Sequence, residues 1–297
     1  MSKPTIGFIG LGLMGAAMAG RLQDKGYALN VIANRSREAI DIAVGRGATE
    51  VQTSKELAEA SDVIMLCVDT SKSVEGRMRG ADGVIAGLKK GAVVLDFGTS
   101  LPTSTTVLAE EVAAKGASML DAPLGRTPAH AKDGLLNIMA AGDEATYASV
   151  KPVLDDLGEN VFHVGPIGAG HTLKLINNFV AQTFVCAMSE GFVMADKAGL
   201  PRQALYDVMS AGPNHSGMMD FVKGFAIDGD PTKLEFAITN ARKDVGYYAD
   251  MADQMGLPSQ MSGAAKNALG LAKANGMGDN MVSEMVTFFE DLFEEPK

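Results

Sequence analysis

The feature that most constrains the fold is the segment Gly10-Leu11-Gly12-Leu13-Met14-Gly15 near the N-terminus. It follows a short apolar run at residues 5–9 and opens a stretch, AAMAGRLQDKG, that is typical of a helix. In a strand-turn-helix context Gly10 permits the tight turn, Gly12 lets the backbone approach a pyrophosphate, and Gly15 lets the helix pack closely on the strand. The helix N-terminus then faces the anion. The six residues therefore predict a dinucleotide-binding loop, and the alternative is a glycine-rich packing turn without a ligand.

Short apolar runs alternate with helical stretches through the first half of the chain. Strands are expected at 5–9, 29–33, 62–68, 92–97 and 117–121, with helices at 36–46, 54–60 and 103–115. Two further strands, at 134–140 and 160–164, flank a helix at 143–157. Such alternation of continuous apolar strands with helices predicts a parallel sheet covered on both faces.

From residue 167 the pattern becomes helical throughout. One unbroken helix is expected at 167–199, followed by helices at 201–210, 235–255, 260–275 and 279–293. The predicted fold class is therefore α/β: an N-terminal Rossmann domain with a doubly wound sheet, residues 1–165, followed by an all-helical domain, residues 166–297, for substrate binding and oligomerisation.

Composition excludes several kinds of partner. The 297 residues carry a net charge of −10 with no basic stripe, which argues against a nucleic-acid partner. The glycine-interrupted start, with only Lys3 before it, does not read as a signal peptide, and no other segment reaches membrane-spanning length without charges. Cys67 and Cys186 lie in apolar runs and the four histidines are scattered, so we expect no metal and a cytoplasmic protein.

The end of the second strand bears on which nicotinamide cofactor binds. An NAD enzyme usually places Asp or Glu there to bind the ribose 2′-hydroxyl. This chain has Asn34, Arg35 and Ser36 instead. Arg35 can pair with a 2′-phosphate, which favours NADP, although NAD is retained as the other cofactor. The alternative is that Ser36 caps a helix beside surface arginines.

Polar residues interrupt the apolar start of the long helix. Asn177 and Asn178 lie three and four residues after Lys174, so the three side chains are predicted to share one helix face. An ammonium and two carboxamides suit a cleft better than a core, although a solvated stripe is the alternative. A lysine placed in a cleft can hydrogen-bond a carbonyl oxygen and donate a proton to it.

The stretch DAPLGRTPAHAKDG at 121–134 places Arg126 in a turn directly after an expected strand. An arginine in this place is either a solvated loop charge or a group that binds an anion. The residues alone leave both interpretations open.

Taken together, the fragments GFIGLGLMG, DFGTSLP, DAPLGRTPAHAKDGLLNIMAAG, GAGHTLKLINN and ARKDVG resemble, in order and spacing, the β-hydroxyacid dehydrogenases. That family includes 3-hydroxyisobutyrate, tartronate semialdehyde and 6-phosphogluconate dehydrogenases. The resemblance covers essentially the whole chain and implies a site between a Rossmann and a helical domain. It also implies Lys174 as catalytic acid/base, Asn178 as its orienting neighbour, and Thr99 and Lys243 beside the cofactor. Family members commonly form dimers or tetramers, so a homodimer or homotetramer is expected.

Two positions depart from the usual pattern of the family. Val68 is followed by Asp69 in place of a proline in the loop beside the nicotinamide. Gly125-Arg126-Thr127 replaces the usual Ser-Gly-Gly turn, and this variant looks like that of the sulfolactaldehyde reductases, in which the arginine holds a sulfonate. Those reductases also use a serine where this chain has Ala181.

The expected function is reduction of a small anionic aldehyde by NADPH, with sulfolactaldehyde as one candidate. Lys174 and Asn178 would be catalytic, and Gly125, Arg126, Thr127 and Asn177 would bind the substrate. Oxidation or reduction at 3-hydroxyisobutyrate, tartronate semialdehyde or succinic semialdehyde/4-hydroxybutyrate is the enzymatic alternative. A dinucleotide-binding scaffold without catalysis is the alternative from another class.

Overall fold

The computed structural model describes residues 3–34 and 37–294. The chain divides into two compact units, Met1–Lys174 and Leu175–Lys297. This division falls within a long helix, nine residues after the predicted end of the Rossmann domain at residue 165. The domain boundary at 165 stays a prediction.

The main sheet of the first unit has six parallel strands in the order β3-β2-β1-β4-β5-β6. Their bounds are β1 (Ile6–Ile9), β2 (Leu29–Ile32), β3 (Thr49–Val51), β4 (Val63–Leu66), β5 (Val93–Asp96) and β6 (Ser118–Asp121). The chain winds outward from β1 to β3 and then returns to β4 on the other side of β1, so the strand order reverses there. Ligands of open α/β sheets bind outside the carboxyl ends of the strands at such a reversal. The predicted doubly wound sheet is confirmed.

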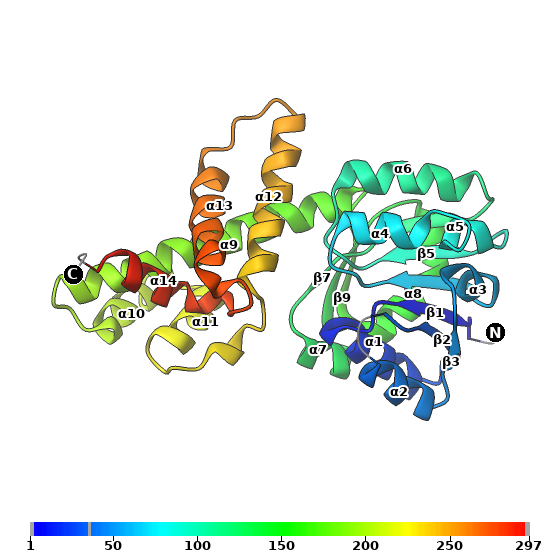
Figure 1. Cartoon of the computed structure of the whole chain (residues 1–297), viewed down its shortest axis with the longest axis horizontal. Coiled ribbons are helices and arrows are strands. Elements are labelled where there is room, and N and C mark those ends of the chain that lie inside the picture. The colour runs from blue at the N-terminus through cyan, green and yellow to red at the C-terminus, as the bar shows by residue number, and fades with distance from the viewer. Residues whose placement is uncertain (1–2, 35–36, 295–297) are drawn as a thin grey trace. The chain divides into compact units, whose positions relative to one another are not determined.

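Helices cover both faces of this sheet, as Figure 1 shows for α1 and α2 on one side and α4, α5 and α6 on the other. The helices of this unit are α1 (Leu13–Asp24), α2 (Glu38–Gly45), α3 (Ser54–Glu59), α4 (Ser71–Met78), α5 (Val84–Gly87), α6 (Pro102–Ala113), α7 (Pro128–Asp133) and α8 (Glu144–Leu157). Every residue of β1, β2, β4 and β5 is buried, which explains why their sequences are apolar except for Asn30 and Asp96.

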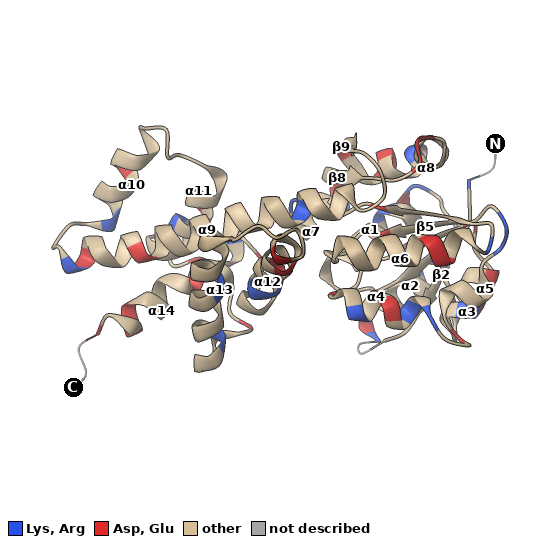
Figure 2. Cartoon of the chain, turned by 90° about the horizontal axis from the view of Figure 1, so that it is seen from above, with Lys and Arg blue, Asp and Glu red and all other residues tan. Residues whose placement is uncertain are grey.

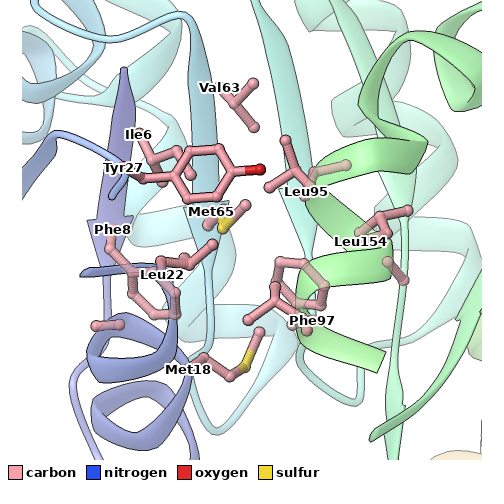
Figure 3. Packing of buried hydrophobic residues seen from close by; sticks show 14 of the residues in the cluster. Ile6, Phe8, Met18, Leu22, Tyr27, Val63, Met65, Leu95, Phe97 and Leu154 are labelled. Carbon is pink, nitrogen blue, oxygen red and sulfur yellow. The ribbon is translucent and has the colours of Figure 1, made fainter. Parts of the chain in front are cut away.

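One face of the sheet is packed as shown in Figure 3. Phe8 and Met65, from the neighbouring strands β1 and β4, lie in one buried cluster with Leu22 of α1, Leu95 of β5 and Leu154 of α8. Fully burying one such side chain contributes about 1.5–3 kcal/mol, so this cluster fixes α1 and α8 on the sheet.

A second, smaller sheet follows the last strand of the first. It has the order β7-β8-β9, with β7 (Leu124–Gly125) antiparallel to β8 (Leu136–Ala140) and β8 parallel to β9 (Gly158–His163). The expected strands at 134–140 and 160–164 correspond to β8 and β9. The very short strands β3 and β7 were not predicted because two or three residues carry no periodic signal.

The second unit is all-helical, as predicted. Its helices are α9 (Ala169–Lys197), which begins in the first unit, α10 (Arg202–Ser210), α11 (Gly217–Ala226), α12 (Ile238–Gln254), α13 (Gln260–Ala272) and α14 (Met285–Leu292), with short turns η1 (Pro231–Lys233), η2 (Lys273–Met277) and η3 (Val282–Glu284). Helix α11 was not predicted, and α12 and α14 are shorter than expected.

Charge is sparse along α9. It carries Lys174 in its second turn and then no charged side chain before Glu190, and most of its ribbon is tan in Figure 2. In the part of the chain that the structure describes, no helix combines the length and apolarity that crossing a bilayer requires.

Candidate active site

The loop from β1 to α1 is built by close backbone packing. Gly10 has φ of 97°, and a Cβ there would lie 2.3 Å from the carbonyl oxygen of Cys67. A Cβ on Gly15 would lie 2.0 Å from the carbonyl oxygen of Gly10, so both positions exclude a side chain. At Gly12 a Cβ would meet nothing within 4 Å among the described residues. Neighbouring backbone therefore fills the space beside Gly10 and Gly15, whereas the space beside Gly12 is open.

The open side of this loop suits a pyrophosphate. Gly12 is the N-cap of α1 and supplies no side-chain cap, and the first turn contains no acidic residue. The N–H groups of that turn and the positive end of the helix dipole thus remain for an anion. Leu11 and Met14 pack against the core below, while Leu13 is 74% exposed. The residues present fit a nicotinamide dinucleotide.

The other predicted cofactor residues follow the carboxyl ends of neighbouring strands. Asn34 is exposed two residues after β2, whereas Arg35 and Ser36 lie outside the described residues. Val68 is half-buried after β4, and Asp69 is exposed and accepts a hydrogen bond from Ser73 Oγ at 2.7 Å. Thr99 is half-buried after β5. Because β2, β1, β4 and β5 are adjacent and parallel, these residues lie along the same edge of the sheet.

The turn that holds Arg126 has an unusual backbone. Arg126 has φ of 76°, and no other non-glycine residue among those the structure describes has a positive φ. Its Nη1 donates to the carbonyl oxygen of Leu135 at 2.6 Å and to Glu159 Oε2 at 2.5 Å. Its side chain is 30% exposed. Gly125 ends β7 just before it, and the Thr127 hydroxyl shares a 2.8 Å hydrogen bond with His130 Nδ1.

The first turn of α9 is held by a carboxylate from the sheet. Asp121, at the end of β6, accepts hydrogen bonds from the backbone N–H groups of Gly168 and His171, both at 2.7 Å. These are donors that a helix N-terminus leaves unpaired. Asp121 is fully buried, and this burial raises the pKa of its carboxyl group. Lys174 follows one turn later and is half-buried.

The two asparagines after Lys174 differ in environment, although both were predicted to share its helix face. Asn177 is exposed, whereas Asn178 is 6% exposed and donates through Nδ2 to Asp244 Oδ2 at 2.6 Å. Asn177 Nδ2 donates in turn to Asn178 Oδ1 at 3.2 Å. Lys243 Nζ lies 3.0 Å from Asp244 Oδ1. A short polar chain thus links α9 to α12 within the second unit.

Asp244 was missed by sequence reasoning. It is 1% exposed, and buried carboxylates are rare unless they are paired. The signal was present in the fragment ARKDVG, where Asp244 occupies a core-facing position of an amphipathic helix beside Ala241 and Val245. Of the predicted residues, the dinucleotide loop, Thr99, the Arg126 turn and Lys174 lie in the first unit, and Asn177, Asn178 and Lys243 lie in the second.

Comparison with known families identifies the class. Residues 5–165 match a family model described as the NAD-binding domain of 6-phosphogluconate dehydrogenase. Residues 168–289 match one described as NAD-binding of NADP-dependent 3-hydroxyisobutyrate dehydrogenase. The chain therefore belongs to the β-hydroxyacid dehydrogenase family. It is an NAD(P)-dependent oxidoreductase of the hydroxyacid dehydrogenase type.

Individual relatives agree with this class. The chain is 30% identical to 2-(hydroxymethyl)glutarate dehydrogenase of Eubacterium barkeri, over 97% of this chain and 95% of that one. It is 33% identical to 3-sulfolactaldehyde reductase of Escherichia coli, over 92% and 91%. The crystal structure of 3-hydroxyisobutyrate dehydrogenase from Salmonella typhimurium superposes with a TM-score of 0.85 at 28% identity, covering 96% of this chain and 100% of that one. The chain also spans about half the length of the human nuclear factor N-PAC, at 30% identity.

Proposed function

We propose that this enzyme reduces a small aldehyde carrying a sulfonate or carboxylate group and uses NADPH in preference to NADH. Arg126 would bind the anionic end of the substrate, and Gly125, Thr127 and Asn177 are the other residues proposed to bind the substrate. Lys174 would be the catalytic acid and Asn178 its orienting neighbour. The reverse reaction, oxidation of the corresponding hydroxy acid, uses the same groups.

The observation that carries this proposal is the left-handed backbone of Arg126. A non-glycine residue at φ of 76° is strained by about 1–3 kcal/mol, and such strain concentrates at functional sites. Glycine would occupy this position without strain. An arginine at this position is better explained by what its side chain does than by a solvated loop charge.

The guanidinium also keeps one edge for a ligand. Both of its hydrogen bonds run from Nη1, to Leu135 and Glu159, while Nε and Nη2 have no hydrogen-bond partner among the described residues. Nε–H and Nη2–H form a fork that matches two oxygens of a carboxylate or a sulfonate. The protein contacts therefore fix the orientation of the fork without using its second edge.

Lys174 would complete the reaction at the carbonyl. The bound nicotinamide supplies the hydride to the carbonyl carbon. The Lys174 ammonium stabilises the negative charge that develops on oxygen and donates a proton to it, which yields the hydroxyl group. Asn178 lies one turn after Lys174 on α9 and is held by a 2.6 Å hydrogen bond to Asp244. A side chain fixed in this way would restrict the orientation of the Lys174 side chain.

The cofactor preference rests on the residues after β2. Asn34 stands where an NAD enzyme has its ribose-binding carboxylate, and the next residue, Arg35, can pair with a 2′-phosphate. The description of the second family model as NADP-dependent supports the same preference. Thr99, Val68, Asp69 and Lys243 are proposed to contact the cofactor.

The test is a steady-state panel of sulfolactaldehyde, succinic semialdehyde, tartronate semialdehyde and a neutral aldehyde of matched length, each with NADPH and NADH. For Arg126→Ala we expect KM for the anionic aldehydes to rise by a factor equivalent to about 2–3 kcal/mol, with little change for the neutral one. Arg126→Lys should restore part of the loss because it keeps the charge but not the fork. An unchanged KM on every anionic aldehyde would make Arg126 a surface charge.

The same panel tests the acid. Lys174→Ala should lower kcat by about 10²-fold or more while leaving the NADPH dissociation constant nearly unchanged. Lys174→Arg should stay slow, because a guanidinium keeps the charge but does not release its proton. Turnover near the wild-type rate in either variant would remove Lys174 from the mechanism.

Two alternatives have some support. The relative that carries the name 2-(hydroxymethyl)glutarate dehydrogenase favours a carboxylate substrate, so the comparison of sulfolactaldehyde with its carboxylate analogue decides between the anions. Ala181, on α9, favours the carboxylate, since it offers no hydroxyl for a third oxygen. The second alternative is a dinucleotide-binding scaffold without catalysis. The chain matches about half of the longer nuclear factor N-PAC, whose name states no enzymatic activity. NADPH consumption is therefore the first measurement, because a scaffold would bind NADPH without consuming it.

A further inference from the structure

His171 lies in the first turn of α9, is fully buried, and has no part in the proposed reaction. Its Nδ1 shares a 2.8 Å hydrogen bond with the hydroxyl of Thr105 in α6. The same Nδ1 lies 3.8 Å from Asp121 Oδ2, and its Nε2 lies 3.8 Å from Asp96 Oδ2. One imidazole ring therefore lies between the ends of two adjacent strands and a helix.

Each partner of the ring is itself fixed. Asp96 is 1% exposed and accepts hydrogen bonds from the Gly98 backbone at 2.9 Å and from Ser100 Oγ at 3.0 Å. The Thr105 hydroxyl also contacts the carbonyl oxygen of Leu101 at 3.2 Å. The ring thus lies among buried groups that are themselves hydrogen-bonded, and a movement of the first turn of α9 would change its contacts.

Packing alone does not explain this residue. Nε2 has no hydrogen-bond partner among the described residues, and a buried polar atom without one costs about 1–3 kcal/mol. Two buried carboxylates beside the ring add to the polar groups removed from water. An apolar side chain would fill this position without leaving a ring nitrogen unpaired.

The spacing on the helix indicates what the ring controls. Lys174 follows His171 by three residues, so the two lie on neighbouring turns of the same helix face. A shift of about 1 Å in a catalytic group can lower the rate by about 10²-fold. A ring that is hydrogen-bonded to Thr105 of α6 and lies beside the ends of β5 and β6 would therefore set where the Lys174 turn begins.

We propose that His171 is a positioning residue for Lys174, held in place by Asp96, Asp121 and Thr105. The inference rests on the proposed role of Lys174 as the catalytic acid. It predicts that replacing His171 slows the chemical step without weakening cofactor binding, and that this effect disappears when Lys174 is absent.

The experiment is a double-mutant cycle. For His171→Leu we expect kcat to fall by about 10- to 100-fold, with the NADPH dissociation constant, measured by fluorescence titration, within twofold of wild type. With NADPH deuterated at the transferred position, the isotope effect on kcat should rise because hydride transfer becomes slower relative to product release. His171→Leu combined with Lys174→Ala should be no slower than Lys174→Ala alone, because residues that act as a unit are non-additive.

Several outcomes would overturn the inference. A wild-type kcat in His171→Leu, or a double variant in which the two losses multiply, would show that His171 does not act through Lys174. A lower unfolding temperature with unchanged kcat and isotope effect would assign it a purely structural role. If Lys174→Ala keeps its activity, the proposed function itself is wrong. The single variant shows this failure independently of the result for His171.

Two further variants guard against loss of folding in His171→Leu, and a third is the control for nonspecific effects. His171→Gln keeps an amide that can bond Thr105 and should retain most of the rate, and Thr105→Val removes the hydroxyl and should lose several-fold in kcat. If both match wild type, the pocket does not position Lys174. His163→Gln is the control: His163 also uses one ring nitrogen, for a 2.9 Å bond to the carbonyl oxygen of Gly142, but lies at the end of β9 and should keep wild-type kinetics.

Discussion

Two turns of the first unit each contain a residue with positive φ, but they are built differently. In the β1–α1 loop the residue is Gly10, with φ of 97°, and neighbouring backbone fills the space that a side chain would need. In the turn after β7 it is Arg126, with φ of 76°, and its side chain is bound to Leu135 and Glu159. In the β1–α1 loop the backbone N–H groups would bind the ligand, whereas in the turn after β7 the side chain of Arg126 would bind it.

The difference separates what is common to a fold from what is particular to a protein. A backbone surface binds a pyrophosphate in many dehydrogenases, because every chain has N–H groups and a helix N-terminus. A guanidinium placed at one position, as proposed for Arg126, would select among substrates. We therefore expect changes in the β1–α1 loop to affect folding and cofactor, and changes at Arg126 to affect substrate.

The largest effect is expected from Gly15→Ala. Its Cβ would lie 2.0 Å from the carbonyl oxygen of Gly10, and because this atom is backbone, relief requires movement of the loop. The free energy of unfolding should fall by about 3 kcal/mol or more, measured by urea denaturation.

Gly12→Ala is the matched control within the same loop. Its Cβ would meet nothing within 4 Å among the described residues, so stability should change by only about 0.5 kcal/mol. NADPH binding should still weaken, because the Cβ would keep the pyrophosphate away from the backbone N–H groups, and one charge-assisted contact is worth about 1.5–3 kcal/mol. If both variants unfold equally, or if Gly12→Ala binds NADPH normally, the backbone account of this loop is wrong.

The next effect is expected at Arg35, which is proposed to bind the 2′-phosphate that NADPH has and NADH lacks. Arg35→Ala should reduce the preference for NADPH over NADH in kcat/KM by roughly tenfold or more, because a charge-assisted contact to the 2′-phosphate is worth about 1.5–3 kcal/mol. The check is kcat/KM for both cofactors at a fixed aldehyde concentration. A wild-type enzyme that prefers NADH would contradict this reading before any variant is made.

A smaller effect separates backbone from side chain at Arg126. Arg126→Gly and Arg126→Ala both remove the guanidinium, but only glycine accepts φ of 76° without strain. Arg126→Gly should therefore be more stable than Arg126→Ala by about 1 kcal/mol. Thermal unfolding measures the difference, and both variants should show the same rise in KM. Equal stabilities would mean that the turn relaxes and that strain was no guide to function.

The smallest effect is expected at Glu159. Its carboxylate lies beside the proposed anion site and is 51% exposed, so its repulsion of a substrate anion is screened by water. Glu159→Gln should lower KM for anionic aldehydes by about two- to threefold, a change within the range of exposed charge pairs. Asp155→Asn removes a similarly exposed carboxylate that pairs with Lys151 and should leave KM unchanged. A rise in KM would show that Glu159 serves mainly to hold Arg126.

Much of the fold could be predicted from local patterns. The strands β1, β2, β4 and β5 are buried along their whole length, so their apolar runs were recognisable. The uninterrupted helical pattern after residue 167 likewise predicted α9. The strands β3 and β7 have three and two residues and depend on their neighbours in the sheet, which a local pattern does not report. Helix α11 contains Gly217 and Gly224, which weaken a helical pattern.

By itself, the sequence determined the class of protein. Each signal lies within a short segment of the chain: the glycine spacing, the residues after β2, the Lys174 motif and the Arg126 turn. Such segments can be recognised without the tertiary structure, and they were enough to predict a Rossmann fold and an NAD(P)-dependent reaction. Only the tertiary structure brought together Asp96, Thr105, Asp121 and His171, and Asn178 with Asp244, since these contacts join residues far apart in the sequence. The positive φ of Arg126 was likewise decided by the tertiary structure, because it follows from how β7 and its neighbours pack.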